Sequence, residues 1–214
     1  MLDIKMSEIN YYEEGYIKSN LPTSIKNRLW TEINSTLWIN DNVDQIYNKI
    51  PAWYQSNINF NLKKDGSNRP EYERLVGKEL FQKSPITLRQ IAYDLIKTDD
   101  FLFFYNYYQY ANLLYIDVWN GAEEIPYHCD TINGADTFIL IYLTEKNNWQ
   151  SEWGGQIALK KEIERKTLYE NKYSPYDGLM LIVNNANPLV KHQVNSLHNS
   201  NVNRYTFSFY YKWN

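Results

Sequence analysis

FLFFYNYY (101–108) and NLLYIDVW (112–119) open a series of short segments that are rich in β-branched and aromatic residues. The series continues with IPYHCD (125–130), TFILIYL (137–143), GGQIALK (154–160), GLMLIVN (178–184), LVKHQV (189–194) and RYTFSFYYKW (204–213). Turn-forming residues separate the segments, which is the pattern of β-strands. About eight strands after a helical start fit two facing antiparallel sheets better than alternating strands and helices. The sequence therefore predicts a mainly β protein with N-terminal helices and a double-stranded β-helix, a jelly-roll or cupin-like barrel.

Two segments before Phe101 have the apolar spacing of amphipathic helices. The first is expected to start at Asp41 or Asn42, and the second at the Ser84–Pro85 pair or at Thr87. The apolar positions that define them are Val43, Ile46, Tyr47 and Ile50 in the first, and Leu88, Ile91, Ala92, Leu95 and Ile96 in the second.

A polar segment, KKDGSNRPEYER (63–74), lies between the two helical patterns. It contains Gly66 and Pro70, so we expect a surface loop near a substrate. With 214 residues, one domain over 1–214 is the expected organisation. Residues 1–100 are then a mostly helical support region, and residues 101–214 are the jelly-roll core.

Charge and cysteine content limit the classes of partner. The formal net charge is −3, from 22 basic and 25 acidic residues, which gives no basic surplus for nucleic acid or an anionic membrane. The opening residues lack the apolar run of a secretory signal, and no later stretch is apolar enough to span a bilayer. Cys129 is the single cysteine, which excludes an internal disulfide and fits a reducing compartment. We expect a soluble, cytoplasmic protein of undetermined oligomeric state.

Two of the three histidines stand where a metal site can use them. His128 and Asp130 are two residues apart, so on a strand both point to one face while Cys129 points to the other and serves as a buried packing residue. His192, in a later strand, is the expected third ligand. Two imidazoles and one carboxylate form the facial triad of non-haem Fe(II) oxygenases, although the ligand types alone also suit zinc. His198 is the competing distal ligand, but it lies in an Asn-rich turn that would hold a metal poorly.

The last strand carries a candidate anion site. Arg204 and Thr206 share one face of RYTFSFYYKW, and a guanidinium beside a hydroxyl suits a carboxylate, since Arg offers paired charge-assisted donors. Gly154 and Gly155 are expected to make a tight turn into the next strand.

In their order HCD, IYLTEKNNWQSEWGGQIAL, GLMLIV, HQV, RYTFSFYY, these motifs resemble the prolyl-hydroxylase-like branch of the 2-oxoglutarate and Fe(II)-dependent oxygenases. The resemblance covers about half of the chain, from Asn112 to Trp213. It implies that His128, Asp130 and His192 bind iron. It also implies that Arg204, assisted by Tyr142 and Thr206, binds the distal carboxylate of 2-oxoglutarate.

Two features depart from the family pattern. Trp119 stands near a position that is often tyrosine at the pocket wall of these enzymes. The interval from His192 to Arg204 is slightly long, which a longer turn through SLHNSNVN would explain.

The resemblance implies a dioxygenase that hydroxylates a C–H bond with Fe(II), 2-oxoglutarate as cosubstrate and O2, with ascorbate as a further candidate cofactor. Because the ligands must be unprotonated, metal affinity should fall in acid. Prolyl hydroxylation of a peptide or protein is the leading substrate hypothesis, with a free amino acid or another small molecule next. Nucleic-acid demethylation is disfavoured, because Tyr210 stands where that branch typically has a second arginine. A non-enzymatic metal-binding jelly-roll module is the alternative of another class.

Overall fold

The computed structural model describes residues 6–40, 48–51, 84–98, 108–119, 124–129, 136–145, 149–198 and 201–213. Its helices are α1 (Met6–Glu13), α2 (Thr23–Ser35) and α5 (Ile86–Leu95), with a short 3-10 turn at Ser151–Trp153. Its strands are β1 (Tyr16–Asn20), β2 (Trp38–Asn40), β3 (Asn48–Pro51), β4 (Tyr108–Trp119), β5 (Ile125–His128), β6 (Thr137–Thr144), β7 (Ile157–Ile163), β8 (Lys166–Tyr173), β9 (Leu179–Asn184), β10 (Val190–Val194) and β11 (Arg204–Trp213).

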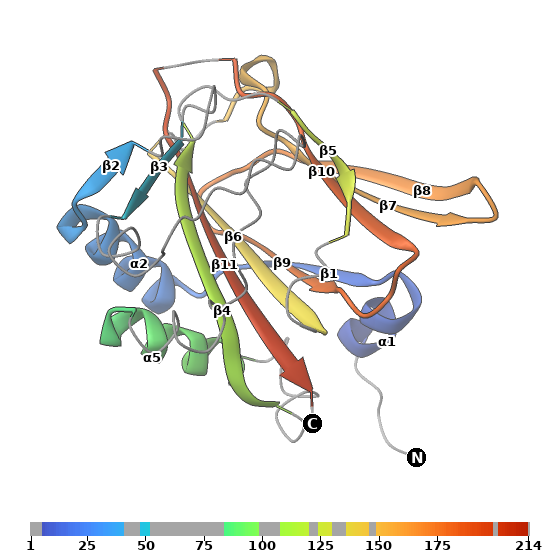
Figure 1. Ribbon diagram of the computed structural model, residues 1–214, viewed down its shortest axis with the longest axis horizontal. Coiled ribbons are helices and arrows are strands. Elements are labelled where there is room, and N and C mark those ends of the chain that lie inside the picture. The colour runs from blue at the N-terminus through green and yellow to red at the C-terminus, as the bar shows by residue number, and fades with distance from the viewer. Residues whose placement is uncertain are drawn as a thin grey trace, which may run out of the picture.

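The strands form two antiparallel sheets. A seven-stranded sheet has the order β1-β9-β6-β11-β4-β3-β2, and a four-stranded sheet has the order β5-β10-β7-β8. Figure 1 shows helices α2 and α5 on one side of the larger sheet and the smaller sheet on the other. The predicted mainly β fold with N-terminal helices and a jelly-roll barrel is confirmed.

The larger sheet buries both of its faces, and β6 shows how. All eight of its residues are buried, and alternate side chains point to opposite faces. Ile139, Ile141 and Leu143 pack in one apolar core with residues of α2 and α5. Phe138, Leu140 and Tyr142 belong to a second core, which fills the space between the two sheets. We call the face of the larger sheet that carries Phe138, Leu140 and Tyr142 the inner face, because it lines the barrel.

The helix expected at Leu88 to Ile96 is confirmed as α5, apart from Ile96, which caps its end. It begins at Ile86 directly after Pro85, as the Ser84–Pro85 pair predicts, and its buried residues are Leu88, Ile91, Ala92 and Leu95. The other expected helix is not supported at its end, because Ile50 lies in strand β3. Pairing of β3 with β2 and β4 overrides the helical spacing there. Val43, Ile46, Tyr47, the caps Asp41 and Asn42, and the loop 63–74 lie outside the described residues.

The structure also contains strands that the sequence did not predict. Strand β1 pairs with β9 at the edge of the larger sheet, from Tyr16 opposite Val183 to Asn20 opposite Leu179. Strand β8, also unpredicted, pairs with β7 to form a hairpin that extends outward in Figure 1. Within the described part of the chain, no helix is long and apolar enough to cross a membrane.

Candidate metal and carboxylate site

The two candidate histidine ligands lie side by side in the smaller sheet. His128 ends β5, His192 lies in the middle of β10, and the two residues are paired directly in the antiparallel register. Their ring centroids are 4.2 Å apart. His192 is buried on the inner face between Val190 and Val194, whereas His128 is half-buried. The structure thus brings together the HxD histidine and the distal histidine that the sequence selected.

A backbone contact orients the ring of His128. Its Nδ1 lies 2.8 Å from the carbonyl oxygen of Pro126, so Nδ1 is the protonated nitrogen that donates in this pair. In the neutral tautomer Nε2 then carries the lone pair that a metal ligand requires, and such a bond to the other ring nitrogen is the usual way to orient a ligating histidine. Asp130, the third expected ligand, lies outside the described residues. Without it, the described His, Cys, Asp and Glu side chains include no group of three that would hold a metal.

Aromatic side chains connect the histidines to the inner face of the larger sheet. The ring of Phe138 on β6 lies 5.1 Å from that of His192, and Tyr210 on β11 stacks on Phe138 at 5.6 Å. Phe138 and Tyr210 are paired in the β6–β11 register and both are buried. The histidine pair therefore faces an aromatic and apolar surface inside the barrel.

Arg204, Tyr142 and Thr206 form the candidate carboxylate site further along the same inner face. Thr206 is paired with Tyr142 in the β6–β11 register, and the guanidinium carbon of Arg204 lies 5.0 Å from the Tyr142 ring centroid. Arg204 is only 1% exposed and donates from Nη1 to the carbonyl oxygen of Gly155 at 2.7 Å. Oγ1 of Thr206 is buried, and none of the described residues forms a hydrogen bond with it. A buried cation and a buried hydroxyl are suited to an anion.

The Gly154–Gly155 pair holds the turn that contacts Arg204. Both residues have positive φ, 75° and 71°, a region that glycine adopts without strain. A Cβ on Gly154 would lie 1.9 Å from the carbonyl oxygen of Ser196, and one on Gly155 would lie 3.6 Å from Nη1 of Arg204. The expected tight turn before β7 is present, and its backbone packs closely against the segment after β10.

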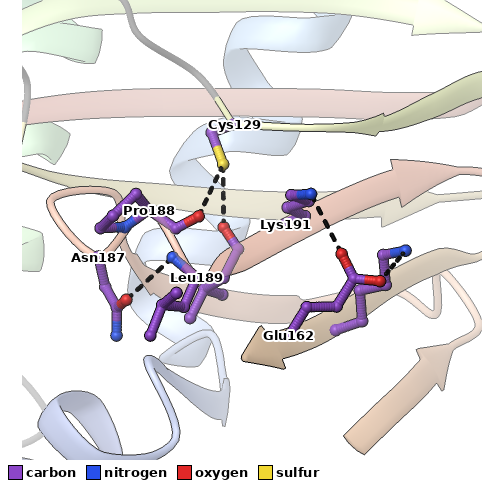
Figure 2. Close-up of polar contacts among 8 residues, drawn as sticks. Cys129, Glu162, Asn187, Pro188, Leu189 and Lys191 are labelled. Carbon is purple, nitrogen blue, oxygen red and sulfur yellow. Dashed lines mark hydrogen bonds and ion pairs between the residues drawn. The ribbon is translucent and has the colours of Figure 1, made fainter. Parts of the chain in front are cut away.

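The structure also places Trp119, His198 and Cys129. The backbone of Trp119 is directly opposite Arg204 in the β4–β11 register. His198 is exposed, and its backbone N–H donates to the carbonyl oxygen of Trp153 at 2.8 Å. Cys129 is half-buried rather than fully buried, because it follows the last residue of β5, His128. Its thiol lies 3.3 Å from the carbonyl oxygen of Val190 and 3.8 Å from that of Pro188. Figure 2 shows these two thiol contacts.

A charged cluster covers the outer face of the smaller sheet. Glu162 pairs with Lys160 at 3.0 Å and with Lys191 at 3.1 Å, and hydrogen bonds from both lysines lower the pKa of Glu162. Figure 2 shows the pair of Glu162 with Lys191. Tyr127 lies below the Lys160 ammonium, 4.0 Å from ring centroid to Nζ. Burial, with nearby carboxylates led by Glu170, raises the pKa of Tyr127 to about 12. Tyr127 therefore stays neutral at physiological pH, on the opposite side of β5 from the histidine pair.

Comparison with protein-family models and with curated protein sequences finds no match. Solved structures do match over nearly the whole chain. A prolyl hydroxylase from Trichoplax adhaerens, in complex with a hypoxia inducible factor oxygen degradation domain peptide, superimposes with a TM-score of 0.56 at 17% identity, over 95% of this chain and 86% of that one. The chain has the prolyl-hydroxylase fold.

Two further structures share this fold. A Pseudomonas putida prolyl-4-hydroxylase gives a TM-score of 0.51 at 12% identity and covers 95% of each chain. A Burkholderia pseudomallei oxidoreductase of the 2OG-Fe(II) oxygenase family gives 0.53 at 14% identity, over 98% of this chain and 91% of that one.

Within the prolyl-hydroxylase fold of this chain, sequence reasoning missed three contacts of the site. These are the Pro126 carbonyl at His128, the Phe138 ring at His192 and the Gly155 carbonyl at Arg204. The two carbonyl contacts are backbone contacts, and residue type gives no signal for them. The alternation of β6 did place Phe138 on the same face as Tyr142 and thus offered a signal for the contact of Phe138 with His192.

Proposed function

We propose that this protein is an Fe(II)- and 2-oxoglutarate-dependent dioxygenase that hydroxylates a C–H bond. One observation carries the proposal: a paired set of histidines and a buried arginine lie inside the same barrel, between the same two sheets. A structural metal site has no need of the buried Arg204 and Thr206. The fold shared with prolyl hydroxylases supports the same function.

His128, Asp130 and His192 would hold the iron. The donor set fits, because two imidazoles and a carboxylate leave one face of an octahedral ion open. Nδ1 of His128 donates to the Pro126 carbonyl oxygen, and Nε2 would be the nitrogen that binds the ion. When bound, iron together with 2-oxoglutarate activates O2 and supplies the oxidising power for hydroxylation.

Arg204 would bind the distal carboxylate of 2-oxoglutarate, with the hydroxyl groups of Tyr142 and Thr206 beside it. The guanidinium carries five N–H donors, and Nη1 donates to the Gly155 carbonyl oxygen. Thr206 contributes a buried hydroxyl that has no hydrogen-bond partner in the described part of the chain. In this environment, charge-assisted hydrogen bonds to a carboxylate are strong because water does not compete.

The apolar inner face would exclude water from the reaction. Leu140, Leu159 and Leu181 are buried between the two sheets, and Phe138 lies next to His192 with Tyr210 stacked on it. A dry pocket strengthens electrostatic contacts and protects reactive species from side reactions. The protein's part in catalysis is thus to hold the ligands, orient the cosubstrate and place one C–H bond.

For the substrate we propose a prolyl residue in a peptide or protein. The support is the fold, because one structure with this fold is a prolyl hydroxylase bound to a peptide. A free amino acid is the second candidate.

With Fe(II), O2 and 2-oxoglutarate, the protein is expected to release succinate when the correct substrate is added. Prolyl-containing peptides are the first set to test, followed by free proline and other amino acids, with succinate and a mass gain of one oxygen atom as the readouts. Asp130→Ala should abolish the release because it removes the carboxylate ligand. If a broad screen gives no succinate above the metal-free control while the protein holds its metal tightly, the metal-binding module replaces the oxygenase.

A further inference from the structure

The N-terminal segment (residues 6–20), which contains α1 and β1, lies against both sheets of the barrel. Strand β1 extends the larger sheet through β9. Tyr11 on α1 is fully buried and forms a hydrogen bond with the Thr137 hydroxyl at the start of β6. The next residue of β6 is Phe138, whose ring contacts His192. The segment is therefore packed close to the strands that surround the histidine pair.

Donors from the smaller sheet bind the C-terminal end of α1. Nζ of Lys161 on β7 donates to the carbonyl oxygen of Glu13, and the Tyr169 hydroxyl on β8 donates to that of Glu14. The last carbonyl groups of a helix otherwise lack partners, and a lysine there also complements the helix dipole. From the other sheet, the backbone N–H of Asn184 on β9 donates to the carbonyl oxygen of Gly15 at 2.9 Å. The turn at residues 13–15 thus links the two sheets.

Gly15 lies close to Val190, on the strand that carries His192. Its φ is +86°, and a Cβ built on it would lie 2.3 Å from Cγ2 of Val190. Val190 is buried and points inward two residues before His192, so the two side chains share one face of β10. A β-branched side chain has little rotamer freedom with which to yield. Any side chain at position 15 must therefore displace β10 or the N-terminal segment.

Val190 also contacts the residue that follows His128. Its carbonyl oxygen lies 3.3 Å from the thiol of Cys129, the residue between His128 and Asp130. A shift of Val190 would consequently disturb this contact beside His128 as well as the strand that carries His192.

We propose that the N-terminal segment, through the contact of Gly15 with Val190, is a positioning element for His192 and His128. This inference rests on the proposed function, because it assumes that the histidines bind a metal. Gly15 itself is a positioning residue and touches neither metal nor substrate.

Gly15→Ala is expected to weaken Co(II) binding about tenfold or more, within the range seen when groups that support a metal ligand are changed. Co(II) serves as an oxygen-stable substitute for Fe(II), and its visible absorption spectrum should change as well, because the ligand geometry is altered. Affinity and spectrum are read by titration below the unfolding temperature of each variant.

Gly178→Ala is the matched control. Gly178 has a φ of +92°, so alanine meets the same backbone strain, but its Cβ would lie no closer than 3.2 Å from Cδ of the Lys26 side chain and 3.8 Å from Cβ of Leu21. This variant should lose thermal stability from the backbone strain and bind Co(II) as the wild type does. In the double variant Gly15→Ala/Val190→Ala, the clash with Cγ2 is removed, so Co(II) affinity should recover relative to Gly15→Ala.

The outcomes separate the proposed function from the positioning role of the N-terminal segment. If the wild type binds no Co(II), the proposed function fails. If the wild type binds Co(II) and Gly15→Ala binds it equally well with an unchanged spectrum, the positioning role is wrong and Gly15 serves stability alone. Should Gly15→Ala not fold, Tyr11→Phe tests the same segment by removing its hydrogen bond with Thr137. A several-fold loss of Co(II) affinity in Tyr11→Phe would support the proposal, and no loss would overturn it.

Discussion

His192→Ala is expected to lose more metal affinity than any other single change in the protein apart from the loss of the other ligands. The imidazole of His192 lies buried on the inner face, 4.2 Å from the His128 ring, and no alanine atom replaces its nitrogen. The loss should exceed the roughly 10–100-fold effect of changing a group that only supports a ligand. Metal content after purification and Co(II) titration both measure it.

His198→Ala is the matched control for this variant. His198 is exposed, and its backbone N–H, which the substitution keeps, makes the contact with Trp153. It should bind Co(II) as the wild type does. Undiminished metal occupancy in His192→Ala, together with a loss in His198→Ala, would move the third ligand to the turn after β10.

Arg204→Met is expected to weaken 2-oxoglutarate binding by roughly 2–5 kcal/mol, the usual cost of losing one partner of a buried charge pair. This corresponds to about a 30-fold or larger rise in Kd. Methionine keeps much of the volume of the side chain, which is 1% exposed and has the Tyr142 ring beside it, so the barrel stays filled. Titration of the metal-loaded protein with 2-oxoglutarate measures the effect, and unfolding by heat checks that the variant is folded.

Two comparisons assign the loss to the distal carboxylate. The wild type should prefer 2-oxoglutarate to 2-oxobutyrate, which lacks that carboxylate, and Arg204→Met should lose most of the preference. Arg165→Met removes the same charge from an exposed turn of the β7–β8 hairpin. It should change neither the affinity for 2-oxoglutarate nor that for 2-oxobutyrate. Equal 2-oxoglutarate affinity in wild type and Arg204→Met would mean that another group holds the carboxylate.

The sequence was most informative for strands, in which alternate side chains point to opposite faces of the sheet. The segments TFILIYL, GLMLIVN, LVKHQV and RYTFSFYYKW all lie in strands with the predicted bounds to within a few residues. The same alternation placed Arg204 and Thr206 on one face, and the β6–β11 register confirms that this face lines the barrel. FLFFYNYY lies mostly outside the described residues.

Strands whose burial depends on distant partners could not be predicted. In β8, KTLYENKY, only alternate residues such as Tyr169, Asn171 and Tyr173 are half-buried, and the others are exposed and mostly polar. The short strand β1 owes its structure to pairing with β9, more than 150 residues later, as the Ile17–Ile182 pair shows. Local pattern carries no record of such pairing, and tertiary contacts override weak strand preferences.

In the candidate site, too, only part of the arrangement could be predicted from the sequence. Residue type identified the groups with distinctive chemistry, namely the histidines, Asp130 and Arg204. It gave no indication of the contacts that orient them, because the Pro126 and Gly155 carbonyls are backbone groups that every residue carries. Gly15 was missed for a related reason: its meaning depends on Val190, which only the folded chain brings within contact.

The most direct test of the central claim is a crystal structure of the protein bound to Mn(II) and 2-oxoglutarate, with the metal located by its anomalous scattering. We expect one Mn(II) ion held by Nε2 of His128, by His192 and by Asp130. We also expect the distal carboxylate of 2-oxoglutarate to lie against the Arg204 guanidinium and the Thr206 hydroxyl. An ion bound elsewhere, or 2-oxoglutarate bound without contact to Arg204, would contradict the proposed site.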